Sequence, residues 1–271
     1  MIIEYHRPEK LELALNLLAR PNPLTLALGG GAVLAQPQPH LRTPLLESDA
    51  PFAVVDTQAL GLDAITRTSR ALTAGAAARL SSLLAEPDLP EALRQALRLE
   101  AGANLRRAIT IAGALVTSDG RSPLATLLLA LDAQVTAVSA DPSGSAAGAQ
   151  EKTWDLGDLL PLRADLLRGR LITQVSFTLQ PKMAYAYSAR TPADRPVVCA
   201  ALAQWPSGRV RLALGGFGRL PLLALDGPEP GGLEEAARSA FAYAADQWAS
   251  AEYRSAAAAE LAARCLAEIN L

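Results

Sequence analysis

The sequence has 271 residues, half of them apolar, and a formal net charge of −2 at pH 7. A chain of this length can bury a large core, and two domains, or one domain with a substantial subdomain, are expected. The near balance of charge argues against a nucleic-acid-binding protein, and no apolar run approaches the roughly 18 residues of a membrane-spanning helix. Charged residues close to Met1 interrupt the apolar region that a signal peptide needs, so we expect a protein of the cytoplasm.

The N-terminal region has the pattern of a strand, a helix and a strand. Ile2 to Tyr5 reads as a strand, and Pro8 begins a helix whose apolar residues recur at the spacing of one helical face. Leu24 to Leu28 is a second short apolar run, and Phe52 to Asp56 is a third. We therefore expect a βαβ-like unit at the start of the chain.

Three consecutive glycines follow the second of these strands. The stretch Gly29-Gly30-Gly31-Ala32 has almost no side chain, so its backbone N–H groups could approach a diphosphate closely. It is neither the Gly-x-Gly-x-x-Gly fingerprint nor a P-loop, because no Gly-Lys-Ser/Thr follows. The alternative interpretation is a tight turn in which small residues serve only packing.

A second turn of small residues lies in the middle of the chain. Ala108 to Ile111 alternates like a strand, Ala112-Gly113-Ala114 follows, and Ser122-Pro123 has the pattern of a helix N-cap and first turn. The two turns could flank one elongated ligand. A plain packing joint between a strand and a helix is again the alternative.

The last part of the chain changes in composition. After a Gly, Ser and Ala-rich loop at residues 141–148, strand-like runs occupy Leu171 to Leu179, Val197 to Gln204 and Arg209 to Gly215. Everything after Gly232 reads as helical. This pattern predicts a small sheet backed by helices, which would form a second domain.

Residues with obvious metal or nucleophilic chemistry are few and scattered. Cys199 and Cys265 lie far apart in apolar surroundings, and His6 and His40 have no partner at ligand spacing. We interpret the cysteines as buried hydrophobic residues and expect no metal site in this chain. No catalytic residue is assigned.

Two stretches of the C-terminal half resemble signatures of the FAD-binding medium subunit of the molybdenum hydroxylases, the group of carbon monoxide dehydrogenase and xanthine dehydrogenase. They are Arg209-Val-Arg-Leu-Ala-Leu-Gly-Gly-Phe-Gly-Arg-Leu-Pro and Ser250-Ala-Glu-Tyr-Arg. In the N-terminal half, Leu28-Gly-Gly-Gly resembles the family's first turn, and Thr110-Ile-Ala-Gly-Ala resembles its Thr-Ile-Gly-Gly-Asn/Ser turn. The order of these motifs matches along nearly the whole chain.

The resemblance implies an α+β fold, with an FAD-binding domain of two α/β lobes followed by a small antiparallel sheet packed on C-terminal helices. We place the FAD-binding domain at residues 1–180, with lobes of about 1–58 and 59–180, and the C-terminal domain at 181–271. The strand that begins at Leu171 has its equivalent in the family, and two tyrosines, Tyr185 and Tyr187, lie on one face of a predicted strand. One of them could cover the flavin ring, although packing is the alternative.

The resemblance also implies a role as an oxidoreductase subunit. In the family, electrons pass from a molybdenum cofactor in the large subunit through iron–sulfur clusters in the small subunit to FAD on this subunit, and then to an external acceptor. FAD lies between the two turns. The residues that the resemblance assigns to the cofactor are Leu28, Gly29, Gly30, Gly31, Ala32, Thr110, Ile111, Gly113, Ala114 and Leu171.

Several residues depart from the family's pattern. Gly31 and Ala32 stand where the first turn has polar residues, and Ala112 and Ala114 stand where the second turn has a glycine and a polar residue. Each lost side-chain hydrogen bond is worth about 0.5–1.5 kcal/mol. Two hypotheses therefore stay open: a flavoprotein that binds FAD through its main chain, and a cofactor-free structural or assembly subunit of the same family.

Overall fold

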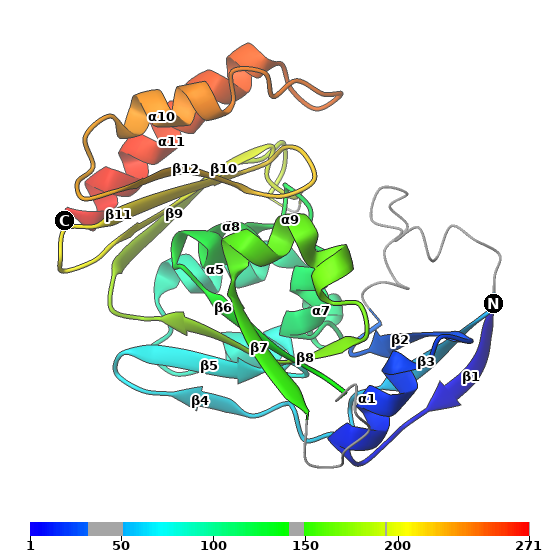
Figure 1. Ribbon diagram of the computed structural model, residues 1–271. Coiled ribbons are helices and arrows are strands. Elements are labelled where there is room, and N and C mark those ends of the chain that lie inside the picture. The colour runs from blue at the N-terminus through cyan, green and yellow to red at the C-terminus, as the bar shows by residue number, and fades with distance from the viewer. Residues whose placement is uncertain (32–50, 141–148, 193, 271) are drawn as a thin grey trace.

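The N-terminal sheet is parallel and small. The computed structural model describes residues 1–31, 51–140, 149–192 and 194–270, and its first sheet has the strand order β1-β3-β2 (Figure 1). The helix α1 (Leu11–Ala19) packs through Ala14, Leu15 and Leu18, which confirms the βαβ-like unit. The carboxyl ends of all three strands lie at one edge, because the strands are parallel. The strands are β1 (Ile2–His6), β2 (Leu24–Leu28) and β3 (Phe52–Asp56).

The second sheet is five-stranded and antiparallel, with the order β4-β5-β8-β6-β7. Its central strand β8 matches the predicted strand at Leu171 to Leu179 within one residue at each end. The short strand β4 and the charged strand β7 were not predicted. The strands are β4 (Ile65–Arg67), β5 (Ala71–Gly75), β6 (Gln134–Ser139), β7 (Gln150–Asp155) and β8 (Arg170–Thr178).

Six helices among the described residues lie in the chain between β5 and β8, and α8 is the most deeply buried of them. Every residue of α8 is buried, and its N-cap Ser122 accepts a hydrogen bond from the N–H of Ala125, as Ser122-Pro123 predicts. In Figure 1, α8 lies between the second sheet and the sheet above it. The helices are α4 (Leu80–Leu84), α5 (Glu91–Glu100), α6 (Ala103–Arg106), α7 (Ile111–Val116), α8 (Pro123–Ala130) and α9 (Leu156–Leu166).

Two local predictions in this region are wrong. The sequence from Ala76 to Leu84 predicts a helix, but the helix begins only at Leu80, because the preceding segment pairs its N–H groups with neighbouring backbone. The strand expected up to Ile111 is a single bridge at Thr110, and Ile111 already begins α7. Alternation of β-branched residues over so short a run does not distinguish a strand from the first turn of a helix.

The third sheet is antiparallel, with the order β12-β11-β10-β9, and two helices cover one of its faces (Figure 1). Along β10, Ala200 and Leu202 belong to the core under α10 and α11, whereas Cys199 and Ala201 belong to the core with α5 and α8. The sheet is thus packed on both faces. Its elements are β9 (Lys182–Ser188), β10 (Val198–Gln204), β11 (Val210–Gly215), β12 (Leu222–Gly227), α10 (Leu233–Ala240) and α11 (Ala251–Ile269).

The C-terminal helical region is interrupted, which corrects the expectation that everything after Gly232 is helical. Residues 241–250 separate α10 from α11 without forming a helix. Ser250 then caps α11 by accepting a hydrogen bond from the N–H of Tyr253. Cys199 and Cys265 are both fully buried, as their apolar surroundings predict.

The glycine-rich stretch after β11 forms a backbone joint with the loop between α7 and α8. Gly216 N–H donates to the carbonyl of Gly120 at 2.6 Å, and Gly120 N–H donates to the carbonyl of Gly218 at 3.0 Å. A Cβ atom at Gly120 would lie 1.8 Å from the carbonyl oxygen of Phe217, which no side chain permits. The Leu-Gly-Gly-Phe-Gly signature therefore attaches the third sheet to this loop.

Arg254, the arginine of the Ser-Ala-Glu-Tyr-Arg signature, stabilises the same joint through hydrogen bonds. Its side chain is fully buried, and its guanidinium donates to the carbonyls of Val197, Ala244, Ala249 and Gly216 and to Asp246. Burial alone would raise the pKa of Asp246, but the hydrogen bond from Arg254 and two backbone N–H groups hold that pKa below its usual range. Both C-terminal signatures thus have a structural role.

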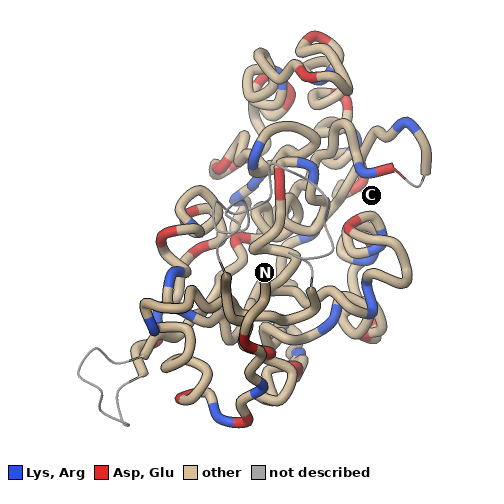
Figure 2. The backbone as a smooth tube through the Cα atoms, turned by 90° about the vertical axis from the view of Figure 1, so that its right-hand side faces the viewer, with Lys and Arg blue, Asp and Glu red and all other residues tan. Residues whose placement is uncertain are grey.

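Charges of both signs are interspersed over the backbone in Figure 2. No helix of the described residues is long and apolar enough to cross a membrane.

Replacing Arg254 by Met should lower the free energy of unfolding by about 3–5 kcal/mol, because Asp246 and several buried carbonyls lose their donor. Arg264→Met is the matched control on the same helix, since Arg264 is exposed and its replacement should change the free energy by less than about 0.5 kcal/mol. Denaturant unfolding followed by circular dichroism measures both variants. Equal stabilities of the two variants would contradict this role for Arg254.

Candidate functional site

The first glycine turn lies at the carboxyl edge of the parallel sheet. Gly29 follows β2 directly, and the carbonyl of Leu28 accepts a hydrogen bond from the N–H of Thr57 at 3.1 Å, which continues the ladder to β3. Gly31 has a φ of +71°, a left-handed conformation that favours glycine. Among the described residues, no atom lies within 4 Å of the position that a Cβ of Gly31 would take.

The two turns are in direct contact. A Cβ atom at Gly29 would lie 2.8 Å from Oγ1 of Thr110, and one at Gly30 would lie 1.9 Å from the carbonyl oxygen of Ala108. Neither position can carry a side chain without moving the second turn. The close approach by itself explains why Gly29 and Gly30 are glycines, whatever else the turn does.

The second turn uses its own N–H groups inside the chain. The N–H of Ile111 donates to the carbonyl of Ala78 at 2.8 Å, and that of Ala112 donates to the carbonyl of Ala76 at 3.3 Å. The N–H of Gly113 donates to Oγ1 of Thr110 at 3.1 Å. The first turn of α7 is therefore held by protein partners, and Thr110 is its N-cap.

The other residues assigned from the resemblance lie in several environments. Ile111 and Ala114 are buried in the main core, where their side chains face other apolar residues. Leu171 is buried in a smaller core with Leu15 and Val55, between α1 and the first two sheets. Ala32 lies outside the described residues. The structure thus brings together Leu28, Gly29, Gly30, Gly31, Thr110 and Gly113 around the two turns.

A network of arginines and carboxylates holds the loop that follows the second turn. Arg195 makes a two-pronged ion pair with Asp119, and Arg121 donates to the carbonyls of Pro196 and Arg195 at 3.0 and 2.7 Å. Burial raises the pKa of Glu100, whose carboxylate accepts hydrogen bonds from Ser122 and from the N–H of Leu124. These contacts connect the N-terminus of α8 to the third sheet.

Tyr185 and Tyr187 lie close together on β9, with ring centroids 6.2 Å apart. Burial raises the pKa of Tyr185 well above its usual value, and the neighbouring Cys199 adds to this rise. Burial also raises the pKa of the Cys199 thiol to about 11, so this thiol is an unreactive neutral group at pH 7. Tyr185 is a core residue, whereas Tyr187 is only partly buried.

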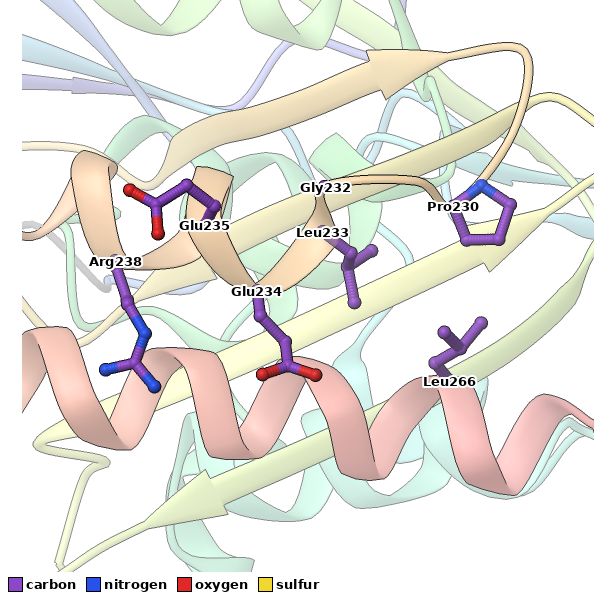
Figure 3. A pocket seen from close by; sticks show the side chains of 7 residues that line it. All are labelled: Pro230, Gly232, Leu233, Glu234, Glu235, Arg238 and Leu266. Carbon is purple, nitrogen blue, oxygen red and sulfur yellow. The ribbon is translucent and has the colours of Figure 1, made fainter.

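Two shallow cavities of the described residues lie away from the glycine turns. One of about 380 Å³ lies between α10 and α11, with Glu234, Arg238 and Leu266 at its rim (Figure 3). The other, about 330 Å³, is lined by residues of α8, α9 and β11 and by Leu222. Neither contains a residue assigned to the cofactor. The described residues also contain no group of three or more His, Cys, Asp and Glu side chains that could hold a metal ion.

The segment before α4 is a part of the site that sequence reasoning missed. Arg79 pairs with Thr110 in an isolated antiparallel bridge, so it lies beside the second turn although 31 positions separate the two residues. No local pattern around Arg79 signals this contact, because only the tertiary fold brings the two segments together.

Several known proteins are similar to this chain. The uncharacterized protein YgfM of Escherichia coli (strain K12) is 29% identical over 216 residues, which cover 80% of this chain and 75% of YgfM. One similar solved structure is a carbon monoxide dehydrogenase of Hydrogenophaga pseudoflava that lacks the Mo-pyranopterin moiety of the molybdenum cofactor. It has a TM-score of 0.77 at 20% identity, and the match covers 98% of this chain and 96% of the dehydrogenase chain. Quinoline 2-oxidoreductase from Pseudomonas putida 86 has a TM-score of 0.70 at 20% identity, with coverage of 98% and 96%.

These likenesses establish the α+β fold expected from the resemblance, with its small antiparallel sheet packed on C-terminal helices. The family described as the FAD binding domain in molybdopterin dehydrogenase matches residues 1–177, which is more than half of the chain. That match includes both glycine turns and the first two sheets. The chain therefore belongs to the FAD-binding domain family of the molybdopterin dehydrogenases, oxidoreductases whose cofactor on this domain is FAD.

Proposed function

We propose that this protein is the FAD-binding electron-transfer subunit of a molybdenum hydroxylase-type dehydrogenase. The observation that carries the proposal is the three-glycine turn at the carboxyl edge of a parallel sheet, in contact with the Thr110 turn. Ligands of open sheets that contain parallel strands commonly bind at this edge. Family membership supplies the identity of the ligand, FAD.

The residues of the first turn fit a diphosphate through their main chain. Gly29, Gly30 and Gly31 are each only partly buried, and no described residue fills the position that a Cβ of Gly31 would take. A main-chain N–H does not depend on residue identity, so the loss of polar side chains at positions 31 and 32 leaves these donors in place. FAD, when bound, can take up electrons from one partner and pass them to another.

Thr110 would act on the cofactor indirectly. Its hydroxyl accepts the Gly113 N–H and lies against Gly29, so it sets the distance between the two turns. Because the N–H groups of residues 111–113 already have protein acceptors, we infer that the second turn shapes and closes the site rather than supplying most of its donors. The network around Asp119 would hold α8 and the third sheet in a fixed position relative to this site.

We also propose two partner subunits for this chain and a path by which electrons reach its FAD. The similar solved structures are a carbon monoxide dehydrogenase, in a form that lacks the Mo-pyranopterin moiety of its molybdenum cofactor, and quinoline 2-oxidoreductase. The molybdenum cofactor named for the first supports a large molybdenum-cofactor subunit as a partner. The family resemblance adds an iron–sulfur small subunit that delivers electrons to FAD. In the proposed arrangement the first two sheets form the two lobes of an FAD-binding domain at residues 1–180, the third sheet forms the domain at 181–271, and the complex lies in the cytoplasm.

A second candidate function is a cofactor-free structural or assembly subunit of the same kind of complex. The observation in its favour is the second turn, where Ala112 and Ala114 carry no polar side chain and the N–H groups of residues 111–113 donate within the chain. In this case the glycine contact would serve packing alone.

The visible absorption spectrum of the protein purified from cells, and again after incubation with excess FAD and desalting, distinguishes the two functions. We expect about one flavin per chain, because the main-chain donors of the first turn remain. The spectrum of protein denatured afterwards gives the amount of released flavin. A colourless protein that cannot be loaded with FAD would support the cofactor-free function instead.

The contact between the turns can be tested at Gly30. Gly30→Ala should lower the free energy of unfolding by about 1–3 kcal/mol and weaken FAD binding, because the new Cβ would overlap the carbonyl of Ala108. Gly102→Ala is the control, since no atom lies within 4 Å of the Cβ position there. Thermal unfolding and flavin titration measure the two effects; a Gly30→Ala protein that behaves like Gly102→Ala would refute the close approach.

A further inference from the structure

Arg79 lies directly opposite Thr110. The N–H of Leu80 donates to the carbonyl of Ile109 at 3.1 Å, and the N–H of Ile111 donates to the carbonyl of Ala78 at 2.8 Å. These two hydrogen bonds flank Arg79 and Thr110, which makes them a non-hydrogen-bonded antiparallel pair with Cα atoms about 4.5 Å apart. Side chains of such a pair leave the backbone on the same side.

That side is the one occupied by the first glycine turn. Oγ1 of Thr110 would lie 2.8 Å from a Cβ at Gly29, so the threonine side chain faces the turn. Because Arg79 lies on the same face as Thr110, we infer that its side chain leaves the backbone in the direction of Gly29 and the neighbouring glycines. A guanidinium on a flexible three-carbon stem can reach a group bound at the turn.

The Arg79 guanidinium has no partner among the described residues. The side chain is exposed, forms no hydrogen bond or ion pair with a described residue, and does not cap the helix α4 that it precedes. Arg106, which the sequence also places near the second turn, differs in this respect, because its guanidinium donates to the carbonyls of Arg98 and Ala101. Arg79 therefore remains free to bind an anion.

The acidic residue at the end of β3 already has hydrogen-bond partners. The carboxylate of Asp56, at the end of β3, accepts hydrogen bonds from the hydroxyl of Tyr5 at 2.5 Å and from the N–H of Gln58 at 2.9 Å. Thr57, the next residue, continues the ladder to Leu28. Asp56 thus has internal partners, and among the described residues Arg79 has none.

We propose that Arg79 is a cofactor-binding residue whose guanidinium contacts the diphosphate of FAD at the Gly29–Gly31 turn. This inference rests on the proposed flavoprotein function. It also explains how the site can lose polar side chains in both turns, since one charge-assisted, two-pronged contact to a phosphate is about twice as strong as a neutral hydrogen bond.

The test compares FAD affinity of the wild-type protein with that of Arg79→Ala, Arg79→Lys and Arg70→Ala, measured by quenching of flavin fluorescence at low and high salt. We expect Arg79→Ala to raise the Kd for FAD about tenfold and to reduce the dependence of this Kd on salt. The Kd of Arg79→Lys should lie between those of the wild-type protein and Arg79→Ala. Arg70 is the matched control, an exposed arginine in the β4–β5 turn at the other end of β5 from Gly75, and its replacement should leave the Kd unchanged. Circular dichroism confirms that each variant is folded.

Riboflavin, which lacks the diphosphate, distinguishes a contact to phosphate from an indirect effect on the flavin pocket. The Arg79→Ala variant should bind riboflavin as the wild-type protein does. Equal FAD affinities of Arg79→Ala and Arg70→Ala, or an equal loss for riboflavin and FAD, would overturn the inference while leaving the flavoprotein function intact. A wild-type protein that takes up no FAD would overturn both.

Discussion

The close approach of two backbones, Gly29–Gly30 against Ala108–Thr110, is the constraint on which the candidate site depends. A Cβ at Gly30 would overlap the carbonyl of Ala108, so the contact exists only because the side chains are absent. The approach places the carboxyl edge of the parallel sheet against the N-terminus of α7. Packing and the proposed ligand binding therefore involve the same residues, so glycine content is expected with either function.

A close backbone contact that depends on glycine also occurs at the joint between the third sheet and the rest of the molecule. Gly120 meets Phe217 and Gly218 backbone to backbone, and the buried guanidinium of Arg254 ties the carbonyl of Gly216 to Asp246. An arginine so buried is stable only because all its donors find acceptors. Two signatures that suggested a function by resemblance thus act by holding the α7–α8 loop, and with it α8, in position.

The proposed role of Arg79 offers an explanation for the loss of polar side chains in the two turns. Polar side chains are missing at residues 112 and 114, yet Arg79 lies opposite Thr110 with its guanidinium unpaired among the described residues. A charged group on a neighbouring segment can compensate in part for lost neutral hydrogen bonds to a diphosphate, because charge-assisted contacts are stronger. Loss of side-chain donors within a motif is therefore weak evidence for loss of the ligand.

The sequence by itself determined the elements whose signals are local: the βαβ-like start, the Ser122-Pro123 cap, the buried cysteines and, through its motifs, the family. It was misleading near Ile111, where a short β-branched alternation lies in the first turn of a helix. Only the tertiary structure decided that the N–H groups of residues 111–113 are already used, that Leu171 packs under α1, and that Arg79 lies opposite Thr110. The physical reason is that these contacts join segments distant in the chain, and no periodicity or cap in either segment records its partner.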